Sequence, residues 1–162
     1  MTRAPVADAN APRTLDATLR TWATQWDGSA LLGNVEHQEI PDDRGHYHWL
    51  VRLRAGSKDV LTVWFALRQR TVHVEAEVVP APEANAEAFF RYLLVKNASL
   101  REVHLALGPE DGVYLMTHLP VGEVTVERLD ETVGALVHYA DDIFPTAVSL
   151  GHPSWRLRPH RG

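Results

Sequence analysis

Histidine is the residue type in this chain that is best suited to chemistry, since imidazole groups bind metals and exchange protons near neutral pH. Nine histidines occur among 162 residues. His46 and His48 share one face of an expected strand, and His73 lies on a later strand, so three imidazoles on facing strands could hold zinc. Alternation around His73, however, places it on a polar face with Glu75 and Glu77. This pattern favours solvated histidines, and we predict no metal site.

Paired carboxylates are the next candidates, because two of them can act as general acid and base. Asp141 with Asp142, and Glu75 with Glu77, are the nearest pairs. Such chemistry needs a cleft and two separated pKa values, and both pairs fit a solvated face better. The signatures of serine hydrolases, phosphate-binding loops, dinucleotide-binding folds and zinc proteases are missing from the sequence. We therefore expect no catalytic residue, no enzyme activity and no cofactor.

Composition narrows the class of protein further. The length and the 45% apolar content fit one globular domain. The chain has no cysteine, which excludes thiolate nucleophiles and is compatible with a reducing cytoplasm, where we place the protein. A net charge of −5 disfavours nucleic acid, and no run approaches the roughly 18 apolar residues of a membrane span. Residues 1–12 lack the apolar core of a signal peptide and are interpreted as a flexible leader.

Three helices are expected to frame the domain, because apolar residues recur there at helical spacing. In the first helix they fall at i, i+4, i+7 and i+11. Pro145 is expected to end or kink the third helix, since proline lacks the N–H that a helix interior requires. The expected helices begin near Arg13, Pro82 and Thr125, and the first two end near Asp27 and Asn97.

Six strands are expected between these helices, because polar and apolar residues alternate there and turn residues separate the runs. The hairpin-like turns favour an antiparallel sheet over parallel βαβ units. The chain is therefore predicted to be an α+β domain of order α-β-β-β-β-α-β-β-α, with an antiparallel sheet and three flanking helices. The expected strands are 35–40, 47–54, 59–67, 72–78, 103–107 and 112–119.

One strand face could contact a partner. Leu50 and Trp64 fall on the face that also carries Arg52. Tryptophan and arginine dominate binding hot spots, so we predict a partner-binding site made of Leu50, Arg52, Trp64 and Arg68. Two alternatives stay open. A helix or the leader could cover this face, or the register could be shifted by one residue, which would invert every side chain.

The sequence also resembles a known family along an ordered series of motifs. These include R-Q-R-T at residues 68–71, P-x-P-E-x-N at 80–85 and the helix end from Tyr92 to Asn97. The series covers roughly residues 50–151 and is similar to the YbjN family of bacteria, labelled sensory transduction regulators. The resemblance implies a fold like that of type III secretion chaperones, which are usually dimeric, bind polypeptides along apolar patches and are not enzymes. We expect a leader at 1–12, the YbjN-like domain at 13–151 and a basic tail at 152–162.

The favoured hypothesis is a homodimeric module that binds one or more cytoplasmic proteins or peptides. An edge strand, or the strand around Trp64, could pair across the two-fold axis. A second hypothesis is a small-molecule pocket lined by Trp64, Phe65 and Phe90. A third is weak binding of single-stranded nucleic acid, with Trp64 as a stacking platform. The basic residues that this third hypothesis uses are Arg52, Arg54, Arg68 and Arg70.

Overall fold

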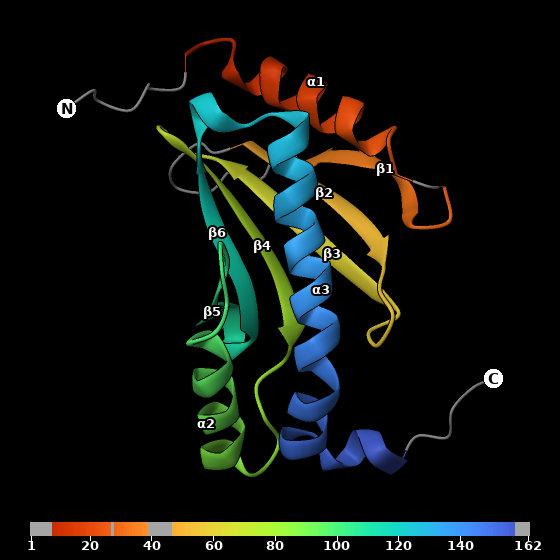
Figure 1. The fold of residues 1–162 in the computed structure, drawn as a ribbon, viewed down its shortest axis with the longest axis vertical. Helices are drawn as coiled ribbons and strands as arrows, with labels where there is room; N and C mark the ends of the chain where they lie inside the picture. The colour runs from red at the N-terminus through yellow and green to blue at the C-terminus, as the bar shows by residue number, and fades with distance from the viewer. Residues whose placement is uncertain (1–7, 27, 39–46, 158–162) are drawn as a thin grey trace.

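The computed structural model describes residues 8–26, 28–38 and 47–157, and a six-stranded antiparallel sheet runs through its centre (Figure 1). The strand order in the sheet is β1-β2-β3-β4-β6-β5. The predicted α+β class and the predicted order of helices and strands are confirmed. The strands are β1 (Leu31–Gln38), β2 (Tyr47–Arg54), β3 (Val60–Leu67), β4 (Thr71–Val79), β5 (His104–Leu107) and β6 (Val113–Pro120), and the helices are α1 (Ala11–Ala23), α2 (Ala86–Asn97) and α3 (Val126–Gly151).

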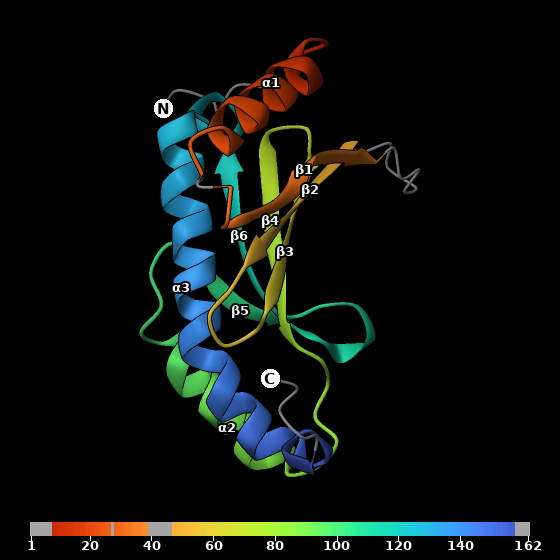
Figure 2. The ribbon, with the colours of Figure 1, turned by 90° about the vertical axis from the view of Figure 1, so that its right-hand side faces the viewer.

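All three helices lie on the same side of the sheet, as the view in Figure 2 shows. Helix α3 runs along the sheet and contacts β4 and β6, α1 crosses the upper end, and α2 packs beside α3 and against β5. Within the described residues, the opposite side carries no helix, and we call it the open face. Its central row is Leu50, Trp64, Glu75 and Met116, which the strand register places side by side.

The hydrophobic core fills the space between the helices and the inner side of the sheet. Alternate residues of β2, β3 and β4 point inward, as their alternation predicts. Trp22 of α1 contacts Phe65 of β3 edge to face, with ring centroids 6.4 Å apart. Burying each such side chain stabilises the fold by about 1.5–3 kcal/mol. Fully buried members include Leu19, Trp22, Leu53, Val63, Phe65, Leu115, Leu129 and Leu136.

The first strand differs from its prediction. It begins at Leu31, not at Val35. A bulge between Leu32 and Glu36 interrupts its pairing with β2. Gly33 in this bulge has φ +82°, a conformation that residues with a side chain rarely adopt. The bulge removes the alternation by which a strand is recognised in sequence. The expected end at Ile40 lies outside the described residues.

Pro145 does not end the third helix, which continues to Gly151, and the lower part of α3 runs at an angle to its upper part (Figure 2). Proline at this position leaves the carbonyl oxygen of Asp141 without its helical donor. The hydroxyl of Ser57, in the turn between β2 and β3, donates to that oxygen at 3.1 Å. The turn therefore satisfies the carbonyl that the proline frees. None of the described helices, α3 included, is long and apolar enough to cross a membrane.

The chain beyond α3 is better ordered than expected. The sequence suggests a loose tail from His152, but residues Pro153–Leu157 form a 3₁₀ helix. The His152 side chain is 1% exposed, lies near Phe89 and Trp155, and approaches the carbonyl oxygen of Pro80 at 3.2 Å. These contacts fix the start of the tail against the linker before α2.

Candidate partner-binding surface

Trp64 lies at the centre of the open face and is partly buried. The register pairs it with Leu50 on β2 and with Glu75 on β4. Leu50 is 1% exposed, so its side chain offers no surface to a partner in this structure. The open face thus presents a large aromatic side chain beside a buried aliphatic neighbour on the adjacent strand.

The two arginines predicted for this site lie at its borders. Arg52, two residues after Leu50 on β2, forms an ion pair with Glu36 of β1. Arg68 follows the end of β3, where its backbone N–H donates to the carbonyl oxygen of Thr71 at 2.8 Å. Strand register therefore brings Leu50, Arg52 and Trp64 together. It places Arg68 at the β3–β4 turn, next to a histidine pair.

That histidine pair is a feature of the open face that sequence reasoning missed. His73 of β4 and His118 of β6 are directly opposite each other, with His73 Nδ1 and His118 Nε2 2.9 Å apart. The other ring nitrogen of His73 lies 2.9 Å from the Glu75 carboxylate. Burial lowers the pKa of the His118 imidazole below its usual value, and His73 and His104 lower it further. Polar alternation along the sequence placed each histidine on the outer face of its strand, but nothing in the sequence shows that β4 pairs with β6.

The lower end of the open face also carries perturbed groups. Lys58 donates from Nζ to the Glu77 carbonyl oxygen at 2.6 Å, and burial lowers the pKa of its ammonium group. Tyr114 lies opposite Glu77, and burial raises the pKa of its phenol, an effect that the Glu77 carboxylate increases. At this end of the face, Lys58 and Glu77 are therefore neighbours of opposite charge.

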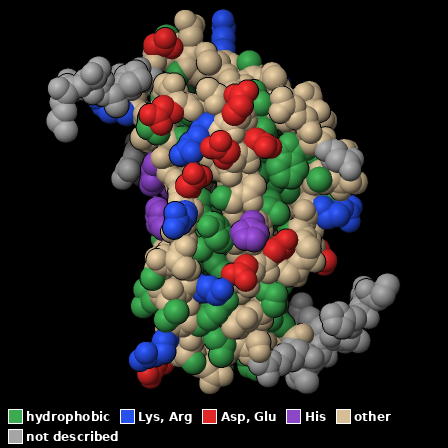
Figure 3. All heavy atoms as spheres, viewed as in Figure 1, with side chains coloured by type: hydrophobic (Ala, Val, Ile, Leu, Met, Phe, Trp, Pro, Cys, Tyr) green, Lys and Arg blue, Asp and Glu red, His purple; other side chains and the backbone are tan. Residues whose placement is uncertain are grey.

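A second surface, which the sequence analysis did not single out, lies over α2 and β5. Leu94, Val95 and Leu107 are 70%, 68% and 55% exposed, although their side chains are large and apolar. Leu94 and Leu107, with Phe90, line a groove of about 320 Å³ between the helix and the edge strand. Val95 lines a neighbouring hollow on the outer side of α2, which Phe90 and Leu94 also line. Figure 3 shows hydrophobic side chains gathered over this lower part of the molecule. We call it the α2–β5 surface. The wide apolar stripe of α2 was the feature of the sequence that could have indicated this surface.

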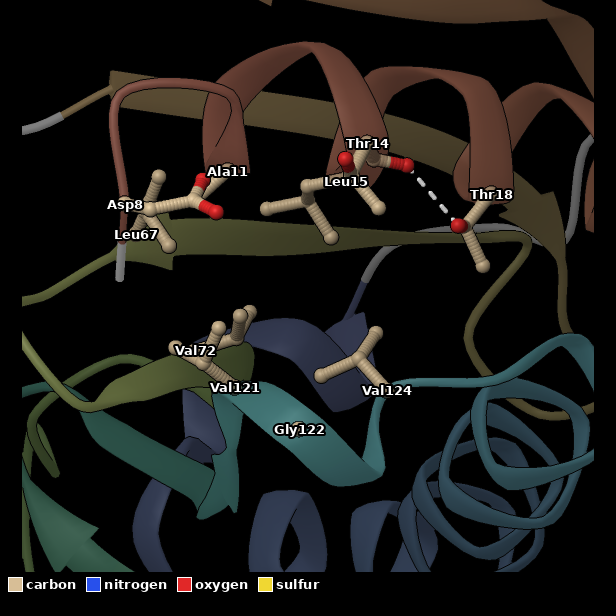
Figure 4. Close-up of a pocket in the computed structure, with 10 residues that line it drawn as sticks. All are labelled: Asp8, Ala11, Thr14, Leu15, Thr18, Leu67, Val72, Val121, Gly122 and Val124. Atoms are coloured by element: carbon tan, nitrogen blue, oxygen red, sulfur yellow. Dashed lines mark hydrogen bonds between the residues drawn. The ribbon is translucent and has the colours of Figure 1, made fainter. Parts of the chain in front are cut away.

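A smaller hollow of about 210 Å³ lies between α1 and the β6–α3 connection (Figure 4). Leu15, Val72 and Val124 point into it from three elements, and Thr14 and Thr18 lie along its rim. Thr18 donates its hydroxyl proton to the carbonyl oxygen of Thr14 at 2.8 Å, so this polar group is satisfied within the helix. The hollow carries no convergent set of polar groups that would orient a ligand.

The zinc arrangement considered from sequence does not assemble from the residues that can be placed. His46 lies outside the described residues. His48 and His73 are separated by Ala66 on the intervening strand, which puts them two strand spacings, about 9.5 Å, apart. In the described ranges, no three histidine, cysteine or acidic side chains are grouped to hold a metal ion.

The positions of these side chains also bear on the small-molecule pocket and on the nucleic-acid hypothesis. Trp64 and Phe65 are neighbours on β3 and point to opposite faces of the sheet, with Phe65 fully buried in the core, so they cannot line one pocket with Phe90. Of the arginines invoked for nucleic acid, Arg52 pairs with Glu36. Arg54 donates from Nε to the carbonyl oxygen of Ser29 at 3.1 Å.

Comparison with known sequence families identifies this chain. Residues 17–148 match the model of the YbjN family, described as "Putative bacterial sensory transduction regulator". This match covers most of the chain, and the protein belongs to the YbjN family. The resemblance found along residues 50–151 is thereby confirmed and extended to α1 and β1.

Relatives of the chain occur in mycobacteria. The uncharacterized protein ML2442 of Mycobacterium leprae is 25% identical over 155 residues, covering 87% of this chain and 83% of the relative. The uncharacterized protein Rv0487 of Mycobacterium tuberculosis is 27% identical over 118 residues. That match covers 70% of this chain but 64% of the relative, so the chain spans just under two thirds of the length of that protein.

Solved structures define the fold class. A chain of the heterodimeric ExoU–SpcU complex, from the type III secretion system of Pseudomonas aeruginosa, matches with a TM-score of 0.52 and 18% identity, covering 83% of this chain and 98% of that chain. The Yersinia pestis chaperone SycH, in complex with a YscM2 fragment, matches with a TM-score of 0.49 and 18% identity, covering 85% and 99%. The predicted secretion-chaperone-like fold is confirmed.

Proposed function

We propose that this chain is a non-enzymatic protein-binding module that acts as a homodimer and holds a cytoplasmic protein partner on its open face. The observation that carries the proposal is Trp64, a partly buried indole at the centre of a sheet face over which the described chain places no helix. Tryptophan at such a position contributes large contact area at low cost in side-chain entropy. The chaperone-like fold supports the same conclusion.

The chemistry of the open face suits a polypeptide partner. Trp64 lies beside Leu50 on the neighbouring strand, and Arg52, two residues further along that strand, forms an ion pair with Glu36. A hot spot of this kind needs a rigid apolar centre and polar groups around it. Met116, in the same row, adds a partly buried side chain that adapts its shape to different contacts.

The α2–β5 surface supports self-association. Leu94, Val95 and Leu107 are large apolar side chains that stay exposed, and β5 is a short edge strand. Glu87 and Arg91 lie four residues apart on the exposed side of α2. If two copies of α2 cross antiparallel with the two-fold axis at the level of residue 89, each Glu87 meets the Arg91 of the other copy. A two-fold contact needs this self-complementary pattern, so we assign the surface to a second copy of the chain.

Affinity purification from the native cell lysate tests the proposal. Tagged wild-type protein and Trp64→Ala are compared by quantitative mass spectrometry, with Leu94→Ala as a matched control that shortens an apolar side chain on the other surface. We expect at least one protein that is enriched on wild type and Leu94→Ala and depleted about tenfold or more on Trp64→Ala. Equal recovery of every bound protein on Trp64→Ala would contradict the proposal.

A further inference from the structure

The histidine pair lies beside the proposed contact residue. His73 and His118 face each other across β4 and β6, and Glu75, hydrogen-bonded to His73, is the direct neighbour of Trp64 on β3. His118 is exposed, while His73 and Glu75 are partly buried. A partner that covers Trp64 therefore also covers part of the hydrogen-bonded group formed by Glu75, His73 and His118.

Hydrogen-bond chemistry limits how many protons the pair can hold. The contact of 2.9 Å between His73 Nδ1 and His118 Nε2 needs one nitrogen with a proton and one with a lone pair. The neutral pair satisfies this, and so does a pair with one extra proton, because His73 can donate to Glu75 in either state. Two extra protons place a donor on both nitrogens, so this hydrogen bond is lost and two positive rings oppose each other.

Charged and titratable groups of the described residues act on the pair from three neighbouring elements. Arg68 at the β3–β4 turn and His104 on β5 disfavour a positive charge on His118, and Glu75 favours it. On the β3 side, the residue opposite His73 is the uncharged Ala66. Partial screening of the His118 ring from water is the largest influence and lowers its pKa. His118 in the free protein therefore takes up a proton less readily than an isolated histidine would.

We propose that partner binding on the open face is coupled to proton release from the His73–His118 pair. This inference rests on the proposed function. A protein laid over Trp64 removes water from the pair, and removal of water penalises charged imidazolium more than neutral imidazole. Binding is then strongest when the pair is neutral, and affinity falls as the pH drops through the range in which histidine titrates, about pH 8 to 5.

The first arm of the test needs no partner. Imidazole nitrogen chemical shifts are followed by NMR against pH in wild type, in His73→Gln and in the control His138→Gln, which removes an exposed histidine on α3. We expect His73→Gln to raise the titration midpoint of His118 toward the ordinary value for histidine, and His138→Gln to leave it unchanged. A His118 midpoint that is the same in wild type and His73→Gln overturns the inference.

The second arm measures the partner recovered with wild-type bait, by calorimetry at several pH values. The dissociation constant is expected to rise by up to about tenfold per pH unit on acidification, the limit for one linked proton. His118→Gln should reduce this dependence to within about twofold, and His138→Gln should keep it. A flat profile in wild type overturns the inference and leaves the proposed function standing. Failure to recover any Trp64-dependent partner overturns both.

Discussion

The open face and the α2–β5 surface differ in chemistry, and the difference indicates two kinds of occupant. Leu50 on the open face is 1% exposed, whereas Leu94 on α2 is 70% exposed. The open face combines Trp64 and Tyr114 with charged side chains and histidines, a composition found in interfaces that form and dissociate. The α2–β5 surface is mostly aliphatic, as in permanent subunit contacts. We therefore assign the exchangeable partner to the first and a second copy to the second.

The sharpest way to break this comparison is to place a charge on the α2–β5 surface. Leu94→Arg should dissociate the dimer, because two unpaired guanidinium groups would be buried near the two-fold axis, at a cost of about 3 kcal/mol or more. Light scattering should then give a mass near one 18.1 kDa chain instead of about twice that value. Trp64→Ala is the control and should stay dimeric. A wild-type mass near one chain would remove the basis for the assignment.

Matched truncations test whether the two leucines differ as the structure indicates. Leu50→Ala should lower the free energy of unfolding by about 2–5 kcal/mol, because it opens a cavity at a side chain that is 1% exposed. Leu94→Ala should change the free energy of unfolding of the monomer by about 0.5 kcal/mol or less, when it is measured at protein concentrations low enough to dissociate the dimer. Urea denaturation of each variant measures both values. Similar losses for the two truncations would mean that Leu50 is not the buried neighbour of Trp64 described above.

Loss of the indole should affect binding more than folding. Trp64→Ala is expected to weaken binding of the partner by about 2 kcal/mol, roughly thirtyfold in the dissociation constant, as for an interface hot spot. Calorimetry with the purified partner gives this value, and urea denaturation of the variant shows whether the fold persists. A change in affinity below twofold in a folded variant would exclude Trp64 from the contact.

The smallest effect concerns the helix side of β2. Asp16 of α1 accepts a hydrogen bond from Arg20 and another from the Trp49 indole at 3.0 Å. The Arg20 hydrogen bond is the main cause that lowers the pKa of Asp16 below its usual 3.8. A lowered pKa in the folded state gives stability that is present above pH 3.8 and is lost as pH falls through the folded value. The stability advantage of wild type over Asp16→Asn, measured by urea denaturation, should therefore shrink in acid. A difference that stays constant with pH would contradict this.

The sequence predicts most of the fold, because local patterns determine most of it. Alternation along β2, β3 and β4 and the helical stripes gave the right element order. It did not locate the start of β1, because a bulge at Gly33 interrupts the alternation. It left open whether α3 ends at Pro145, because the group that replaces the lost helical donor, Ser57, lies 84 residues from Asp141 in the chain. Long-range compensation of this kind leaves no local signal.

The candidate site was predictable in part, for the same reason. The parity of β2 and β3 placed Leu50 and Trp64 on one face, but parity alone does not show how deeply each is buried. The pairing of His73 with His118 depends on β6 lying between β4 and β5. The connection through α2 makes this arrangement a matter of tertiary packing. Exposure of Leu94 likewise depends on which side of α2 faces α3.

The measurement that tests the account most directly is site-specific crosslinking on both surfaces. Because the chain has no cysteine, Met116→Cys on the open face and Leu94→Cys on α2 can each carry a benzophenone maleimide. In lysate, the probe at residue 116 should crosslink to a different protein, and the probe at residue 94 should crosslink to a second copy of this chain. The account is contradicted if residue 116 links to the second copy, or if residue 94 links to the partner.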